Sequence, residues 1–185
     1  ALGVGADLRV RGSVVMIEGG ARGKKAGGEA VLDNSGCLFV PHVVGVMAGG
    51  RARIRNSDAM LHNTHGLLAG RTVFNLALPV KDQAVDITKR LSKPGVVRVL
   101  RDAHPHMFAW MVVHASPYVT VTDERGAFRI DQVPPGAYKV TMWHEGFRQT
   151  GADKDGRPVY DEPRTATKDV TIPARGSVSI DFDLK

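Results

Sequence analysis

Cysteine is nearly missing from this chain of 185 residues, which contains only Cys37. A single cysteine excludes an internal disulfide framework. Aromatic residues make up only 6% of the chain, and its Lys and Arg residues are scattered, so we expect no nucleic-acid binding despite a formal net charge of +6. A positive face that meets an acidic protein partner or an anionic membrane surface is the better use of this charge.

Long apolar runs and catalytic signatures are also missing. No run reaches the roughly 18 to 20 apolar residues of a membrane-spanning helix. The chain has no Gly-x-Ser-x-Gly elbow and no His-Glu-x-x-His zinc helix. The basic, Gly-rich connector at residues 22–28 is not followed by a helical pattern, which argues against a phosphate-binding loop. We therefore expect a protein that is not an enzyme, and since it opens with Ala1-Leu2-Gly3 we expect a processed or trimmed form.

What the chain does contain is short β-type runs. Hydrophobic residues make up 43% of it, enough to bury a core, and 21 glycines and 10 prolines separate short runs of Val, Ile, Phe and Thr. This pattern predicts an all-β fold. A change of texture near Ser116 suggests a boundary, and a long polar loop is expected at residues 151–163. The expected strands cover residues 7–17, 30–32, 37–46, 51–55, 72–78, 96–100, 109–114, 118–122, 127–130, 138–143, 167–172 and 178–184, with Pro41 implying an edge strand or a bulge.

Side chains that bind metals gather in two stretches, each after an expected strand. Copper sites take imidazole nitrogen and soft sulfur, and these groups must converge from separated strands. His104 and Met107 stand three residues apart across a proline turn, a spacing that lets both point into one cavity. We predict that His62 and His104 bind a metal, and that the side chain of Asn63 ties two loops together through backbone hydrogen bonds. The two stretches, both expected to be loops, are His62-Asn63-Thr64-His65 and His104-Pro105-His106-Met107.

Other candidate ligands keep two interpretations. Met107 either packs in the core or supplies an axial thioether, and His65 and His106 are either further ligands or solvated side chains. A structural hydrogen bond is the simpler role for the remaining histidines, His42, His114 and His144. Cys37 is by default a buried cysteine.

At these residues the chain resembles the cupredoxins, the small copper-binding β-sandwiches that include plastocyanin and amicyanin. The resemblance covers about residues 29–115 and implies a Greek-key β-sandwich with His62, His104 and Met107 at ligand positions. More narrowly, the chain resembles bacterial periplasmic cupredoxins that carry a short carboxypeptidase-regulatory-like module. The residues that carry the resemblance are Phe39-Val40-Pro41, Gly49-Gly50, Asn56-Ser57-Asp58, His62-Asn63 and Arg101-Asp102-Ala103-His104-Pro105-His106-Met107.

Arg101 departs from that family. It stands where the cupredoxin loop holds its cysteine, and a guanidinium cannot supply the thiolate that a blue site needs. Three outcomes stay open. The site binds copper through His62 and His104 with Met107 or His65, or Cys37 replaces the missing thiolate, or Arg101 fills a site that binds no metal.

The C-terminal part resembles a second family, the carboxypeptidase-regulatory-like or transthyretin-like β-sandwich. The resemblance lies in residues 122–128 and 133–138, which are mainly turn sequences. It implies a domain at residues 116–185 after a cupredoxin-like domain at residues 29–115, and we expect residues 7–20 to complete the second domain by pairing with the C-terminal strands.

These expectations combine into one functional hypothesis. The chain is expected to be a periplasmic copper-binding protein for storage, tolerance or delivery, which also meets a periplasmic protein partner. The alternatives are a structural or adaptor protein whose cupredoxin-like site holds no metal, and an electron-transfer subunit if Cys37 supplies the thiolate.

Overall fold

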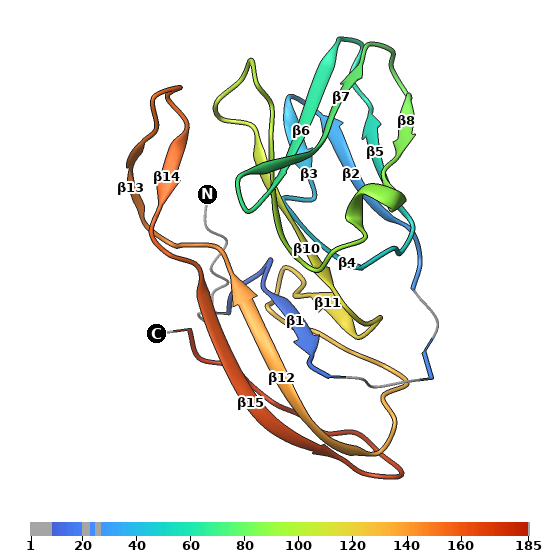
Figure 1. The fold of residues 1–185 in the computed structure, drawn as a ribbon. Coiled ribbons are helices and arrows are strands. Elements are labelled where there is room, and N and C mark those ends of the chain that lie inside the picture. The colour runs from blue at the N-terminus through green and yellow to red at the C-terminus, as the bar shows by residue number, and fades with distance from the viewer. Residues whose placement is uncertain (1–8, 20–22, 25–26, 185) are drawn as a thin grey trace.

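The computed structural model describes residues 9–19, 23–24 and 27–184. Within these ranges the chain forms strands and one short 3-10 helix, η1 (Thr88–Leu91), so the predicted all-β class is confirmed (Figure 1). No helix in the described ranges is long and apolar enough to cross a membrane. Asp7 and Leu8 of the expected first strand, and Arg22 and Lys25 of the basic connector, lie outside the described residues.

Two sheets form a β-sandwich in the first part of the chain. One sheet has the order β4-β10-β9-β6-β7, with β4 and β10 parallel, and the other has the order β3-β2-β5-β8. The first contains β4 (Val43–Met47), β6 (His62–Leu68), β7 (Arg71–Leu78), β9 (Gly95–Leu100) and β10 (Phe108–His114). The second contains β2 (Ala30–Ser35), β3 (Leu38–Val40), β5 (Ala52–Asn56) and β8 (Ala84–Asp86).

The core of the sandwich lies between these sheets. Leu32 and Ile54 come from one sheet, Val97, Val99 and Met111 from the other, and all five belong to one buried cluster. Alternate residues of a strand point to opposite faces, which is why the pattern in β5 is buried, exposed, buried, exposed, buried. Full burial of each such side chain contributes about 1.5–3 kcal/mol.

Pro41 marks the place where the chain changes sheets. The expected strand at residues 37–46 is divided into β3, at the edge of one sheet, and β4, at the edge of the other. Proline has no N–H to donate to a ladder, so it is tolerated where neither sheet needs a bond from it.

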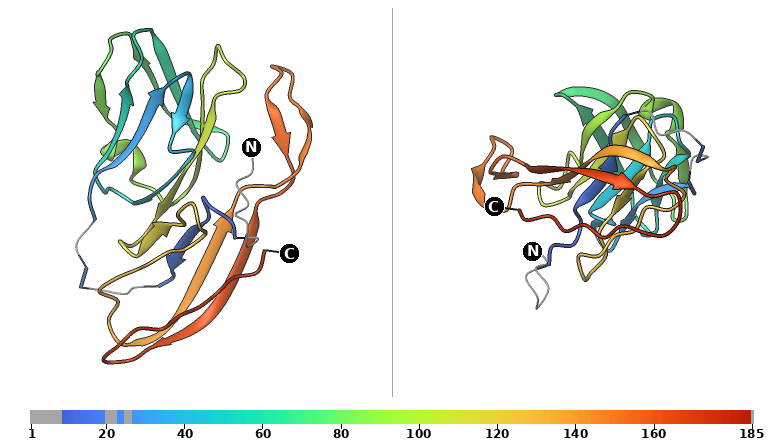
Figure 2. Two further views of the ribbon diagram at one scale, coloured as in Figure 1. Left: turned by 180° about the vertical axis from the view of Figure 1, so that it is seen from behind. Right: turned by 90° about the horizontal axis from the view of Figure 1, so that it is seen from below.

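A third sheet has the order β11-β1-β12-β15, with β11 (Val119–Val121), β12 (Gly136–His144) and β15 (Arg164–Ile172). Its second strand, β1 (Val14–Ile17), pairs antiparallel with both β11 and β12. The N-terminal strand thus belongs to the C-terminal sheet, and the sandwich is formed by the chain between β1 and β11 (Figure 1, Figure 2). The exact domain boundaries stay a prediction.

Three expectations about the C-terminal part are corrected. Residues 127–130 and 178–184 are assigned no strand, although Phe128 and Phe182 contact each other with ring centroids 6.3 Å apart and pack against the core of this part. Alternating hydrophobic residues specify the face that is buried, not a ladder partner. The expected polar loop at residues 151–163 is instead largely a hairpin of β13 (Gln149–Ala152) and β14 (Pro158–Tyr160), whose β13 is exposed and gives no hydrophobic signal.

Candidate functional site

The candidate site lies at one end of the sandwich, where β6 begins and the loop between β9 and β10 passes beside it. β6 pairs antiparallel with β9, and His65 stands opposite Leu100. The first residues of β6 therefore lie next to the loop that starts at Arg101. The sequence analysis predicts a loop at His62. This prediction is wrong, since His62 is the first residue of β6.

His62 is completely buried, and its ring is held from one side. Its Nε2 lies 2.9 Å from Oδ2 of Asp58. Backbone N–H groups of Cys37 and Gly36 donate to the same carboxylate and hold the pKa of Asp58 below its ordinary value. An ionised carboxylate only accepts hydrogen bonds, so Nε2 carries the hydrogen. In the neutral ring Nδ1 then presents a lone pair, and this buried atom has no hydrogen-bond partner among the described residues.

Arg101 places a cation beside this ring. Arg101 is 6% exposed, and its guanidinium donates from Nη2 to the carbonyl of Leu61 at 2.9 Å and approaches the Met107 Sδ with Nη1 at 3.5 Å. Burial and the charge of Arg101 lower the pKa of His62, although Asp58 opposes them. His62 is therefore a neutral imidazole at neutral pH, the form that binds metals.

His104 approaches from the loop. Burial, and then the charges of Arg101 and His106, lower the pKa of His104 as well. Its Nδ1 is buried and, like that of His62, lacks a partner in the described part of the chain. Its ring stacks on that of His106, with the ring centroids 5.6 Å apart, and whether His106 is a further ligand stays a prediction. The charge of Arg101 thus acts on both His62 and His104, and its guanidinium contacts the sulfur of Met107.

Met107 packs in the core, as one of its two interpretations expects, and its role as a thioether ligand stays a prediction. Its side chain is 1% exposed and belongs to the core cluster, while its sulfur contacts Arg101 at the site. Its backbone N–H donates to the carbonyl of His104 at 3.0 Å, and its carbonyl accepts from the N–H of Arg101 at 3.2 Å. These bonds close the loop, so the sulfur and the His104 ring are carried by the same turn.

His65 and Cys37 are not brought to this cluster. The Nδ1 of His65 lies 3.0 Å from Asp102 and its Nε2 lies 2.7 Å from Thr72, so both ring nitrogens are occupied. Strand alternation explains this, since His62 and His65 stand three apart and point to opposite faces. Cys37 is partly exposed, which corrects the expectation of a buried cysteine. Its backbone N–H donates to Oδ2 of Asp58 at 3.1 Å, and its Sγ lies 3.9 Å from the sulfur of Met60.

Asn63 does tie the two stretches together as expected. Its Oδ1 accepts from the backbone N–H of Asp102 at 2.9 Å, and its Nδ2 donates to the Asp102 carboxylate at 2.7 Å. The sequence analysis does not identify Asp58 as the partner of His62. The position of Asp58, in a turn four residues before His62, is the sequence feature that could have indicated it. The sequence analysis also misses Arg157, which reaches the loop from β13–β14 and has no sequence signal.

The remaining histidines have structural partners. The Nε2 of His42 meets the carboxylate of Glu145, that of His114 lies 2.9 Å from the carbonyl of Ile17, and the Nδ1 of His144 lies 2.6 Å from the carbonyl of Glu145. These contacts match the simpler interpretation of each histidine.

The donor atoms fit a cuprous ion and do not fit a blue copper site. Two imidazole Nδ1 atoms and a thioether are ligands that copper(I) accepts, while no thiolate is present at the cluster. No three His, Cys, Asp or Glu side chains of the described ranges gather closely enough to hold a metal, so an ion at this cluster would need the sulfur of Met107 as a further donor. The guanidinium of Arg101 contacts that sulfur and must turn away before Met107 can bind.

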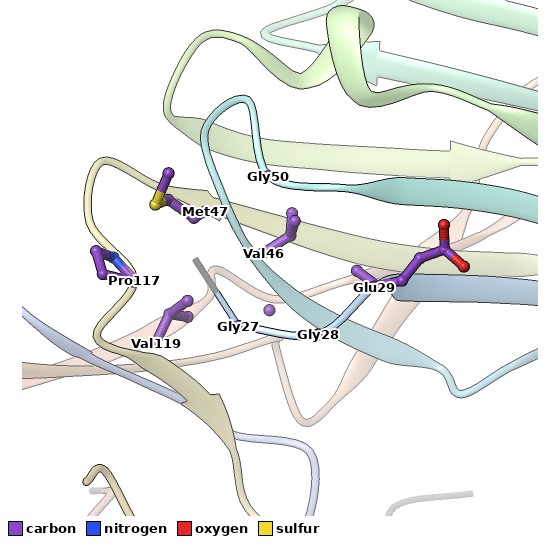
Figure 3. Close-up of a pocket in the computed structure, with 10 residues that line it drawn as sticks. Gly27, Gly28, Glu29, Val46, Met47, Gly50, Pro117 and Val119 are labelled. Atoms are coloured by element: carbon purple, nitrogen blue, oxygen red, sulfur yellow. The ribbon is translucent and has the colours of Figure 1, made fainter. Parts of the chain in front are cut away.

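Two cavities lie elsewhere. One, of about 250 Å³, lies where β4 approaches β11 and is lined mainly by glycines and by Val46, Met47, Pro117 and Val119, with Glu29 as the one charged residue among the described lining (Figure 3). Another, of about 770 Å³, lies between residues 178–184 and the strands of the C-terminal part. Neither includes a residue of the candidate site.

Comparisons with known proteins find similarity to two kinds of domain. The model of the carboxypeptidase regulatory-like domain matches residues 110–185. Among solved structures, amicyanin from Paracoccus versutus is 21% identical with a TM-score of 0.41, covering 46% of this chain and 81% of that one. A purple cupredoxin from Nitrosopumilus maritimus is 18% identical with a TM-score of 0.39, covering 46% and 99%. A copper-containing nitrite reductase from Thermus scotoductus is 18% identical with a TM-score of 0.40, covering 54% and 25%. A comparison with curated protein sequences finds no match.

Proposed function

We propose that this chain is a copper-binding protein of the periplasm, which stores or delivers copper and is not an enzyme. The observation that carries the proposal is the buried Nδ1 atom of His62, which has no partner in the described ranges while Asp58 holds the opposite nitrogen. An unsatisfied buried polar atom costs about 1–3 kcal/mol, so a bound ligand would relieve a real cost. A carboxylate behind a histidine is also the arrangement that orients metal-binding imidazoles.

The proposed ligands are the Nδ1 atoms of His62 and His104 and the Sδ of Met107. Neutral imidazole and thioether suit copper(I), which would be colourless because its d shell is filled. The Sγ of Cys37 contacts the sulfur of Met60 at 3.9 Å, which gives no support to the electron-transfer alternative. The periplasmic location rests on the resemblance to periplasmic cupredoxins, and the net positive charge suits an acidic protein partner.

A second candidate function is favoured by the contacts of Arg101. Its guanidinium already bridges the Leu61 carbonyl and the Met107 sulfur, so it can serve as a permanent internal cation. In that case the sandwich is a metal-free structural or adaptor module. The two candidates differ in whether the guanidinium yields to copper, since a thioether is only a weak hydrogen-bond acceptor.

Copper(I) titration against a competing chelator separates the two candidates. The metal content of protein purified without added metal is measured first, and then the affinities of the native chain and of His62→Ala, His104→Ala and Arg101→Ala. Under the copper proposal the native chain binds, and each histidine variant loses at least about 100-fold in affinity, beyond the ~10–100-fold typical of outer partners.

His65→Ala is the matched control, because its ring is engaged elsewhere, and its affinity should equal that of the native chain. Binding by Arg101→Ala but not by the native chain supports the metal-free module. If neither His62→Ala nor His104→Ala changes the affinity of a chain that binds, the assigned ligands are wrong.

A further inference from the structure

The β13–β14 hairpin of the C-terminal part reaches back to the loop of the candidate site. It extends beyond β12 and β15 and runs beside the sandwich, as Figure 1 and the left view of Figure 2 show. The family match at residues 110–185 includes this hairpin, while the donor atoms of the site come from residues that precede it. Contacts between the two therefore connect distant parts of the chain.

Arg157 makes the central contact. It lies at the tip of the hairpin, yet it is only 6% exposed. Its Nη1 donates to the carbonyl of Arg101 at 2.8 Å and its Nη2 donates to the carbonyl of Asp102 at 3.0 Å. A planar guanidinium can meet two adjacent carbonyls in this way, whereas an ammonium group cannot match its fixed geometry.

The hairpin also holds the other end of the loop and is itself ordered. The ring of Tyr160, on β14, lies 5.7 Å from that of Phe108, the first residue of β10. In the turn, Oδ1 of Asp153 accepts from the backbone N–H groups of Asp155 and Arg157, each at 2.9 Å. Arg157 thus holds the first two residues of the loop 101–107, and Tyr160 contacts Phe108, which directly follows the loop.

We infer that Arg157 is a positioning residue of the candidate site, through which the C-terminal hairpin sets the conformation of the loop that carries Arg101, His104 and Met107. The two carbonyls that it holds belong to the residue whose side chain occupies the site and to the next one. Fixing this backbone directs the guanidinium of Arg101 toward Met107. The inference deepens the proposed function, because it names what controls that same site, but the contacts that carry it involve no metal.

Amide hydrogen exchange and the Met107 methyl resonance test the inference in metal-free protein. In Arg157→Ala we expect the amides of His104 and Met107 to exchange at least about tenfold faster, a loss of about 1.4 kcal/mol of local protection by the standard conversion. We expect amides in the middle of β9 to stay within twofold, and the Met107 methyl signal to shift as Arg101 moves. Arg157→Lys keeps the charge but loses one of the two bonds, so an intermediate change is expected.

Lys154→Ala is the matched control, because it removes a cation from the same hairpin at a side chain that is 89% exposed. It should leave both signals as in the native chain. A uniform rise in exchange across the sandwich with an unchanged Met107 signal would show that Arg157 stabilises the whole sandwich and not this loop in particular, and it would overturn the inference. Identical behaviour of Arg157→Ala and Lys154→Ala would also overturn it. Because neither readout needs copper, failure of the copper proposal leaves this test intact.

Discussion

At the scale of single residues, the candidate site depends on the carboxylate of Asp58, to which the sequence analysis gives no role. Asp58 accepts hydrogen bonds from two backbone N–H groups and from the His62 ring. It therefore joins the turn between β2 and β3 to the start of β6 and also selects the tautomer of His62. Changing its charge should affect both stability and the site.

Asp58→Asn tests this double role. The amide accepts more weakly from the two N–H groups and can donate to Nε2, which would move the ring hydrogen to Nδ1. We expect the free energy of unfolding at pH 7 to fall by about 1–3 kcal/mol and any copper affinity to fall ~10–100-fold. The folded-state pKa of Asp58 is depressed, so this stabilisation is present above the unfolded value and is lost as pH falls through the folded one.

Urea unfolding at pH 7 and at lower pH measures this effect, and the difference between the native chain and the variant should narrow as pH falls below the unfolded-state pKa of Asp58. Asp82→Asn is the matched control, since Asp82 forms an ion pair with Arg55 and is 63% exposed. A variant of Asp58 as stable as that control at pH 7 would contradict the role given to the carboxylate.

Gly66 is a second residue with a local requirement. It lies in β6 opposite Phe74 of β7, and a Cβ at Gly66 would overlap the ring of Phe74, which is buried. Gly66→Ala should therefore destabilise the fold by about 1–3 kcal/mol through overpacking, measured by urea unfolding. Gly151→Ala, where a Cβ meets nothing within 4 Å, should cost little. Equal stability of the two variants would show that the ring of Phe74 moves aside without cost.

At the scale of elements, the strands that flank the site are predictable because their hydrophobic runs end at turn residues. The expected ranges 96–100 and 109–114 each differ by one residue from β9 and β10. The polar run at residues 62–65 contains no apolar residue that marks a strand, so the sequence places it in a loop. It is in fact the first half of β6, where the period of two buries His62 and Thr64 and turns His65 outward.

The residues of the candidate site also divide into those that the sequence predicts and those that it does not. His62, His104, Met107 and Arg101 can be named from the sequence, because residue type and local spacing mark them. Asp58 and Arg157 act through hydrogen bonds whose partners are fixed by the packing of separate elements. Local patterns carry no information about such pairs, and for the same reason they cannot tell that residues 178–184 lack a strand assignment.

At the scale of the whole molecule, the sandwich and the C-terminal sheet meet through close backbone packing. Gly45 of β4 faces β11, and a Cβ there would lie 2.9 Å from Cγ2 of Val119 and 3.4 Å from Cγ2 of Val121. Gly45→Ala should push the two strands apart and lower the free energy of unfolding by about 1–3 kcal/mol. Urea unfolding followed by tryptophan fluorescence measures the change, and a variant as stable as the native chain would show that this junction is loosely packed.

Glu145 forms a polar link across the same junction. It follows the last residue of β12, and its carboxylate accepts from the Nε1 of Trp110 at 2.6 Å and meets the Nε2 of His42. Burial alone would raise the pKa of Glu145, but the hydrogen bond and charge of His42 and the bond from Trp110 outweigh it and hold this pKa below its ordinary value. The carboxylate is therefore ionised at neutral pH and connects the end of the C-terminal sheet to the sandwich.

Glu145→Gln removes the charge while keeping one carbonyl oxygen for Trp110. A depressed folded-state pKa stabilises the fold above the unfolded value, and this stabilisation is lost as pH falls through the folded one. We expect Glu145→Gln to be about 1–3 kcal/mol less stable at pH 7 and to lose less stability than the native chain below about pH 5. Urea unfolding across this range measures both. Glu124→Gln, at a carboxylate that is 81% exposed, serves as the control. Parallel acid profiles for the native chain and Glu145→Gln would mean that the charge does not hold the two parts together, and the junction would then rest on its packing, at Gly45 and in the buried cluster that includes Val14, Val43 and Trp143.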